Sequence, residues 1–144
     1  MKVKVLAYIT RRNREQLELL VHDHKDIPEA GIQVPGGTVE EGEKIEDALF
    51  REIEEESGLK RSKLHLQRKV GVFYYTHPEK QELHERHVFV LHIQGEHLQS
   101  WAHHVTGGGE DEGLVFKYRW EAVHSLPQLA GQQGDYLSLI RKYS

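Results

Sequence analysis

The stretch Gly37–Leu59 reads GTVEEGEKIEDALFREIEEESGL and predicts a turn that enters a helix near Lys44. Apolar residues recur in it at the three- and four-residue spacing of a helix face that packs on a core: Ile45, Ala48, Leu49 and Ile53. Gly58 suits the left-handed backbone position that commonly ends a helix. The stretch therefore predicts one amphipathic helix between Lys44 and Gly58.

Three glutamates continue this core-facing stripe, each seven residues after one of its apolar members: Glu52, Glu55 and Glu56. Like charges at these spacings repel one another, and the C-terminal half of a helix disfavours anions. A cation among them would offset both effects, and an all-carboxylate ligand set favours Mg²⁺ or Mn²⁺ over zinc. The alternative, a solvated acidic face, fits the acidic residues that point away from the stripe: Glu46, Asp47 and Glu54.

The spacing of Gly37, Glu43 and the run Arg51–Leu59 resembles the Nudix box, here residues 37–59, of the Nudix (MutT-like) hydrolase superfamily. The resemblance implies an enzyme that hydrolyses a phosphoanhydride in a nucleoside diphosphate linked to another moiety, such as a nucleoside triphosphate or a dinucleoside polyphosphate. It also implies an α/β fold, an α/β/α sandwich with a mixed, partly antiparallel sheet and the box helix packed on one face.

The resemblance assigns roles within the box. The Gly37 carbonyl and the three glutamates would hold Mg²⁺ (or Mn²⁺), with Glu52 and Glu56 as first ligands and Glu55 as either third ligand or general base. Glu43 and Arg51 would form a supporting ion pair that keeps the carboxylates in position. The cation would lower the pKa of a bound water, and a carboxylate would take its proton.

Length and composition indicate one soluble domain over residues 1–144. A net charge of −4 argues against general nucleic-acid or membrane-surface binding, and against an RNA-cap substrate, since these call for a basic patch. The absence of cysteine fits a reducing cytoplasm. The opening residues alternate like a strand, so we expect no signal peptide, and no apolar run approaches membrane length. We expect a cytoplasmic monomer or homodimer that acts on a small nucleotide-type substrate.

Outside the box, the pattern predicts mostly strands. Residues 2–10 and 17–22 form a predicted hairpin around the basic turn at 11–14, and residues 70–75 and 85–94 form a second antiparallel pair. Residues 114–120 read as a strand and residues 134–143 as a closing amphipathic helix. The stretch 95–113 has no clear period, which is typical of a functional loop.

Four residues outside the box are candidates for substrate binding: Arg11, Arg12, Tyr75 and Trp101. The arginines would reach a phosphate or a base, although a basic turn is usually only solvated. Tyr75 follows the box at a distance that resembles the diadenosine polyphosphate hydrolases, where a tyrosine stacks on a base; the alternative is strand packing. Tyr74 stands where the ADP-ribose hydrolases of the family carry a proline, which argues against ADP-ribose.

The acidic run at residues 110–112 is a candidate for a further ligand or base that faces the box helix: Glu110, Asp111 and Glu112. Ligands on one helix reach a cation from a single side, so a metal pair that bridges a diphosphate needs oxygen donors from across the cleft. Gly107, Gly108 and Gly109 would let the loop fold over a bound substrate. The alternative is an ordinary solvated acidic turn.

Eleven histidines are present, with close pairs at residues 22 and 24, 84 and 87, and 103 and 104. None has the cysteine partner or the His-Glu-x-x-His helix of a zinc site, so we expect most to be surface residues. The alternative to an enzyme is a non-catalytic nucleotide-binding or sensor protein on the same fold, against which the intact box argues.

Overall fold

The computed structural model describes residues 1–109 and 111–141. Residue 141 is described by its backbone alone. Within these residues the strands and α-helices are, in chain order, β1 (Lys2–Asn13), β2 (Gln16–His24), β3 (Gly36–Thr38), α1 (Ile45–Ser57), β4 (Leu64–Thr76), β5 (Leu83–Ile93), β6 (Trp101–His104), β7 (Val115–Ala122) and α2 (Leu137–Arg141). Short 3₁₀ helices lie at Pro28–Ala30, Arg61–Lys63, Val123–Ser125 and Ala130–Gln132.

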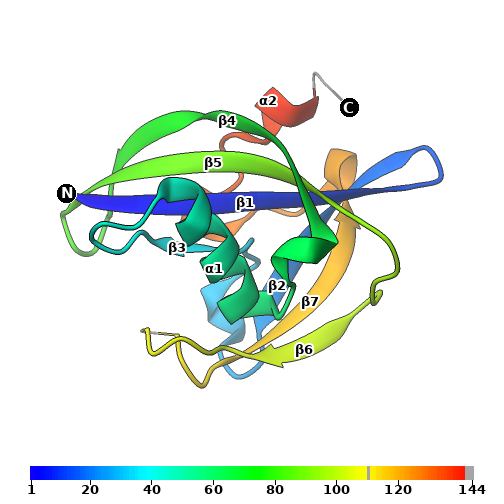
Figure 1. The fold of residues 1–144 in the computed structure, drawn as a ribbon, viewed down its shortest axis with the longest axis horizontal. Coiled ribbons are helices and arrows are strands. Elements are labelled where there is room, and N and C mark those ends of the chain that lie inside the picture. Colours follow the sequence, from blue (N-terminus) through cyan, green and yellow to red (C-terminus); the bar gives the residue numbers. More distant parts are fainter. Residues whose placement is uncertain (110, 142–144) are drawn as a thin grey trace.

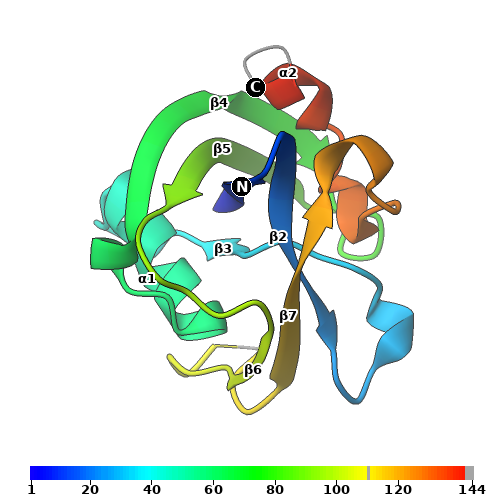
Figure 2. The same ribbon diagram turned by 90° about the vertical axis from the view of Figure 1, so that its right-hand side faces the viewer.

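The strands form one sheet in the order β4-β5-β1-β2-β7-β6, and the short β3 also pairs with β1. β1 and β5 run parallel, whereas the other pairs are antiparallel. The sheet is strongly curved, with α1 against one face and the C-terminal segment with α2 against the other (Figures 1 and 2). The predicted α/β/α sandwich with a mixed, partly antiparallel sheet is confirmed.

β1 is the central strand and is buried on both faces. Val5, Ala7 and Ile9 pack in the hydrophobic cluster beneath α1, whereas Leu6 and Tyr8 pack in the cluster on the opposite face with residues of α2. Side chains alternate between faces along a strand, so a strand with both faces covered reads as apolar throughout. This explains why the polar alternation of residues 2–10 breaks down in the middle of the strand.

The predicted helix is confirmed as α1, and Gly58 ends it in the left-handed conformation, with φ 81°. Each of its last four carbonyls has a donor. Gly58 N donates to the Glu54 carbonyl, Thr106 N to that of Glu55, Tyr118 Oη to that of Glu56, and Trp101 Nε1 to that of Ser57. Helix C-termini leave these carbonyls without intrahelical partners, so strands β6 and β7 fix the position of the acidic half of α1.

Three segments differ from the sequence-based expectation. The stretch 95–113 is not all loop, because residues 101–104 form β6 and pair with β7. β1 continues through the predicted basic turn at 11–14 as far as Asn13, since its pairing with β2 extends to Asn13 and Gln16. The predicted helix at 134–143 is shorter, with α2 beginning at Leu137; residues 142–144 lie outside the described part. No described helix is long and apolar enough to cross a membrane.

Tyr118→Phe should destabilise the protein, because it leaves the buried Glu56 carbonyl without its donor. An unsatisfied buried carbonyl costs about 1–3 kcal/mol, so the free energy of unfolding in urea should fall by that amount. Tyr74→Phe is the matched control, since its hydroxyl bonds Glu85 on a side chain that is 61% exposed. Equal stabilities of the two variants would contradict this account of α1.

Candidate active site

The Arg51 guanidinium joins the loop before α1 to the carboxylates of α1. Nε and Nη2 donate to the two oxygens of Glu43 at 2.8 and 3.0 Å, and Nη2 also donates to the Thr38 carbonyl at 2.9 Å. Nη1 donates to Oε1 of Glu52 at 2.7 Å and to Oε1 of Glu55 at 3.0 Å. Because the two-bonded pair with Glu43 sets the plane of the guanidinium, Nη1 holds the two α1 carboxylates side by side.

The carboxylates of α1 also lie directly against the backbone of β3. A Cβ atom on Gly37 would stand 1.8 Å from Oε2 of Glu52, a distance that no side chain permits. Gly36 N donates to Oε1 of Glu56 at 3.1 Å. Glycine at residue 37 is therefore a steric requirement for the position of Glu52.

Burial and hydrogen bonding shift the pKa values of these carboxyl groups in opposite directions. Glu56 is 7% exposed, and burial raises its pKa well above the ordinary carboxyl value, although the hydrogen bond from Gly36 N lowers it in part. Burial also raises the pKa of Glu52, against the hydrogen bond from Arg51. The hydrogen bond from Arg51 instead lowers the pKa of Glu43. A nearby cation would favour the ionised form of the two buried carboxyls.

The carboxylates line a cleft of about 410 Å³. Glu52, Glu55 and Glu56 lie on the α1 side of this cleft, and Lys2 and Lys4 of β1 also line it. Lys4 Nζ donates to Oγ1 of Thr38 at 2.6 Å, which places this ammonium beside β3. The cleft thus contains both a cluster of anions and a pair of cations.

The loop between β6 and β7 closes the cleft. Thr106 N donates to the Glu55 carbonyl at 3.1 Å, and a Cβ on Gly107 would lie 2.2 Å from the Glu55 carboxylate. Gly107 also has a φ of +99°, which side chains disfavour. Asp111 and Glu112 line the cleft, and the charge of Asp111 contributes to the raised pKa of Glu56. Glu110, the third predicted acidic residue, lies outside the described residues.

The residues predicted to bind substrate lie away from this cleft: Arg11, Arg12, Tyr75 and Trp101. Arg11 is held by Glu18 at 2.7 Å and lies over the Trp120 ring. Arg12 lines a separate hollow of about 70 Å³ near the other end of β1. Trp101 donates to the Ser57 carbonyl and packs on the core. Tyr75 lies on β4, with its hydroxyl hydrogen-bonded to Arg86.

Three of the eleven histidines are exceptions to the expectation that most lie on the surface, because His22, His84 and His87 are buried. His22 stacks on Phe116 with neither ring nitrogen hydrogen-bonded, and burial lowers its pKa to about 3. His84 and His87 each contact a glutamate of their own strand region. In the described residues, no group of three or more His, Cys, Asp or Glu side chains is already gathered to hold a metal ion.

Several residues of the cleft are not predicted from the sequence, among them Lys2, Lys4 and Thr38. The lysines read as the solvent-facing half of a strand, and only the pairing of β1 with β3 brings Lys4 beside Thr38. No local sequence pattern predicts the pairing of β1 with β3.

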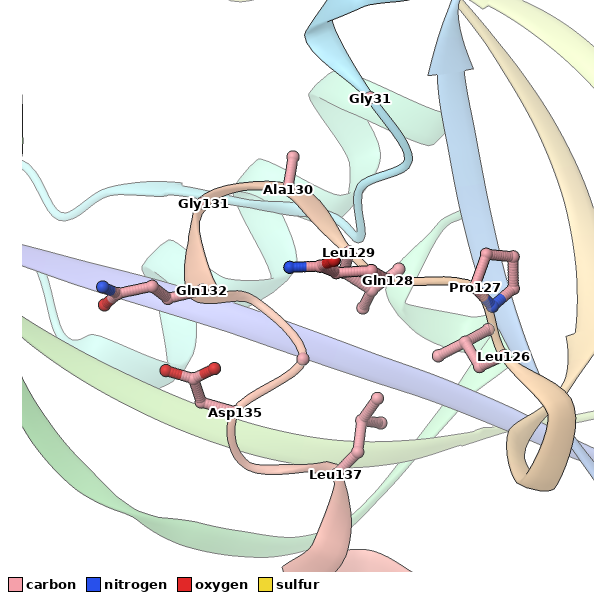
Figure 3. Close-up of a pocket in the computed structure, with 11 residues that line it drawn as sticks. Gly31, Leu126, Pro127, Gln128, Leu129, Ala130, Gly131, Gln132, Asp135 and Leu137 are labelled. Atoms are coloured by element: carbon pink, nitrogen blue, oxygen red, sulfur yellow. The ribbon is translucent and has the colours of Figure 1, made fainter.

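A larger hollow, of about 560 Å³, lies elsewhere, among residues 126–137 and Gly31 (Figure 3). Its lining combines the polar side chains of Gln128, Gln132 and Asp135 with leucines, a proline and small residues. It contains neither the acidic cluster nor the lysines, so the smaller cleft is the candidate active site.

Comparison with known proteins agrees with this geometry. A family model described as NUDIX domain matches residues 1–142. The chain belongs to the NUDIX domain family. The expectation of a Nudix hydrolase is thereby confirmed.

Two curated Nudix relatives match most of the chain. A Bacillus subtilis (strain 168) protein whose name proposes an 8-oxo-dGTP diphosphatase is 35% identical over 121 residues, 84% of this chain and 68% of its own length. Diphosphoinositol polyphosphate phosphohydrolase 3-alpha of Mus musculus is 34% identical over 138 residues, 96% and 77% of the respective chains. The Ap4A hydrolase of C. elegans shares the fold, with a TM-score of 0.72, 16% identity, and coverage of 99% of this chain and 98% of its own.

Gly37→Ala should displace the Glu52 carboxylate, because the new Cβ would occupy its place. Loss of a ligand-positioning contact typically lowers activity by about 10–100-fold, so turnover of a phosphoanhydride substrate should fall by that factor while the fold is kept. Gly134→Ala is the control, since a Cβ there meets only ordinary contacts of 3.7 Å and more. Unchanged turnover of Gly37→Ala would show that Glu52 is not held by this contact.

Glu56→Gln should change how stability depends on pH. The pKa of Glu56 is higher in the folded than in the unfolded chain, so the folded protein binds the carboxyl proton more tightly. The contribution of this proton to stability is therefore complete below the unfolded pKa of about 4.3 and is lost as the pH rises above that value. The glutamine of the variant does not ionise, so the variant does not lose stability in this way as the pH rises. In chelator-treated protein, its free energy of unfolding relative to wild type should increase between about pH 5 and pH 8.

Glu46→Gln, on the exposed side of the same helix, is the control for that titration. A stability difference between Glu56→Gln and wild type that stays constant with pH would mean that Glu56 ionises as freely in the folded as in the unfolded chain.

Proposed function

We propose that this chain catalyses the divalent-cation-dependent hydrolysis of a phosphoanhydride in a nucleoside diphosphate derivative or a similarly phosphorylated small molecule. The observation that carries the proposal is the pairing, in one cleft, of three carboxylates on α1 with Lys2 and Lys4 on β1. The carboxylates suit cations and the lysines suit phosphates. The names of the two curated relatives, a diphosphatase and a phosphohydrolase, support the same bond class.

Mg²⁺ or Mn²⁺ fits the residues of the cleft in donor type. The glutamates of α1 and the backbone of Gly37 offer carboxylate and carbonyl oxygens, which hard cations prefer. The lack of a Cβ at Gly37 lets the Glu52 carboxylate lie against the backbone of β3. Glu56 is a buried carboxyl whose ionised form lacks a cationic partner at hydrogen-bond distance among the described residues. We assign Glu52, Glu56 and the Gly37 carbonyl as ligands.

Arg51 has a positioning role in this proposal. Its Nη1 lies between Glu52 and Glu55, so a cation would compete with it for those carboxylates. Its bonds to Glu43 and to the Thr38 carbonyl hold the guanidinium in place independently of that competition.

Each residue of the cleft then has a share in the reaction. When bound, Mg²⁺ would lower the pKa of a coordinated water and offset phosphate charge. Lys2 and Lys4 bind the phosphate oxygens and orient the anhydride. Glu55, which is half-buried and lies against the Gly107 backbone, is either a third ligand or the base that accepts the proton of the attacking water.

In the proposed mechanism, Asp111 and Glu112 supply carboxylates from the loop between β6 and β7. Asp111 is the stronger candidate, because its charge acts on buried Glu56. Asp111→Asn should lower turnover at saturating Mg²⁺ by about 100-fold if it accepts a proton or holds a cation. Glu112 already accepts the N–H of Gly108, so Glu112→Gln should have a smaller effect. Unaffected turnover in both variants would mean that the residues of the box, 37–59, suffice for catalysis without a carboxylate from this loop.

The test of the proposed function is phosphate release from a panel of phosphoanhydrides, with Mg²⁺ and with chelator. The panel contains 8-oxo-dGTP, unmodified nucleoside triphosphates, a dinucleoside tetraphosphate, a diphosphoinositol polyphosphate, a nucleotide sugar and ADP-ribose. We expect hydrolysis of at least one member, with full loss on chelation. Turnover at the same rate without metal would contradict the mechanism, and tight binding of a member without turnover would favour the sensor alternative.

Glu52→Gln and Glu46→Gln form the matched pair for that assay, because both lie on α1 but only Glu52 lines the cleft. Glu52→Gln keeps the size of the side chain and removes the charge, so turnover should fall by roughly 100-fold or more while Glu46→Gln stays active. Equal activity of the two variants would make the acidic cluster structural.

A further inference from the structure

Arg86 is a buried cation on β5 for which the described residues offer no carboxylate. Its side chain is 6% exposed, and none of the ion pairs in residues 1–109 and 111–141 includes it. Nη2 donates to the Tyr75 hydroxyl at 2.8 Å, and Nη1 reaches the Gly131 carbonyl only at 3.5 Å. Burying a guanidinium without a countercharge is costly, and one phenol and one long bond to a carbonyl compensate only part of that cost.

The hydrogen-bond capacity of Arg86 is not used up by the protein. Its Nε donates to no acceptor among the described residues. A planar guanidinium with donors to spare is the side chain best suited to phosphate.

Tyr75 holds Arg86 in one orientation. The Arg86 guanidinium lies over the Tyr75 ring, 4.1 Å from its centroid, while the Tyr75 hydroxyl is hydrogen-bonded to His84 Nδ1 at 2.8 Å. His84 Nε2 is in turn 2.7 Å from Glu82. This series of hydrogen bonds fixes both the Tyr75 ring and the Arg86 guanidinium before any ligand binds, which lowers the entropy cost of binding.

The position of Arg86 connects it to the cleft. In the sheet, Thr38 pairs with Lys4 and Lys4 pairs with Arg86, so the three lie in one row across β3, β1 and β5. Lys4 and Thr38 line the cleft, and neighbouring strands are about 4.8 Å apart, which places Arg86 about 10 Å from β3 along the row. Figure 3 shows the segment between Gly131 and Asp135 crossing in front of strands of the sheet. Arg86 Nη1 donates to the Gly131 carbonyl of this segment.

We propose that Arg86, held by Tyr75, is a specificity-determining residue that binds a phosphate of the substrate other than the two joined by the cleaved anhydride. This inference rests on the proposed function and narrows it. The substrate is a molecule with at least three phosphates, of which the anhydride lies over the box and another lies over β5. A substrate whose only phosphates are the cleaved pair would gain nothing from Arg86.

The direct test measures binding of inorganic tripolyphosphate by calorimetry, which does not depend on turnover. Arg86→Gln should weaken binding by more than about 10-fold, since truncating a buried charge that meets an anion removes several contacts at once. The affinity of Arg86→Lys for tripolyphosphate should lie between those of wild type and Arg86→Gln, because lysine keeps the charge but lacks the planar guanidinium. Arg119→Gln is the control, as Arg119 is paired with Asp23 and Glu121 on β7 and does not line the cleft.

The second readout separates recognition from a structural role. Arg86→Gln should raise KM for a nucleoside triphosphate, a dinucleoside tetraphosphate or a diphosphoinositol polyphosphate with little change in kcat, and leave KM for ADP-ribose unchanged. Tyr75→Phe removes the hydroxyl that orients Arg86 and should give a smaller change of the same kind. If Arg86→Gln does not fold, Arg86→Lys and Tyr75→Phe carry the test.

Wild-type protein that fails to bind tripolyphosphate, or Arg86→Gln that binds it as wild type does, would overturn the inference. An equal KM increase for ADP-ribose would also overturn it, because Arg86 would then only shape the fold. A wild-type protein that binds tripolyphosphate through Arg86 but hydrolyses no panel member would refute the proposed function and leave Arg86 as an anion site.

Discussion

The bond network of Arg51 is the interaction on which the acidic site depends. Three glutamates within five residues of one helix would repel one another, yet Nη1 of Arg51 donates to two of them, and Glu43 holds the same guanidinium with two bonds. The network also takes in the Thr38 carbonyl, so β3, the loop before α1 and the helix form one rigid unit. The glycine at residue 37 then lets the Glu52 carboxylate lie against β3.

A second constraint acts on the backbone at the C-terminal end of α1. Donors from β6, β7 and the loop between them satisfy the carbonyls of Glu55, Glu56 and Ser57. The same hairpin therefore fixes the C-terminal half of the helix and brings the backbone of Gly107 and the carboxylate of Asp111 to the cleft. Closure of the cleft and stability of the helix are coupled through one set of contacts, which is why a change at Tyr118 bears on both.

The box helix and its acidic stripe could be predicted from the sequence because both are local: the spacing of Ile45, Ala48 and Leu49 and the glycine at residue 58 are sufficient. β6 could not, because residues 101–104 become a strand only by pairing with β7. The row from Thr38 through Lys4 to Arg86 was equally hidden, since it joins three segments that are far apart in the chain. The sequence makes Tyr75 a candidate either for stacking on a base or for strand packing, and neither reading indicates the Arg86 guanidinium that lies over its ring in the structure.

The central claim is that the carboxylates gathered by Arg51 exist to bind a divalent cation at β3. Anomalous diffraction at the manganese edge, from crystals grown with Mn²⁺ and a non-hydrolysable diphosphate, tests it most directly. The account predicts an anomalous peak in contact with Glu52 and Glu56 beside Gly37, and loss of that peak in Glu52→Gln crystals. A peak bound elsewhere, or one that persists unchanged in Glu52→Gln, would contradict it.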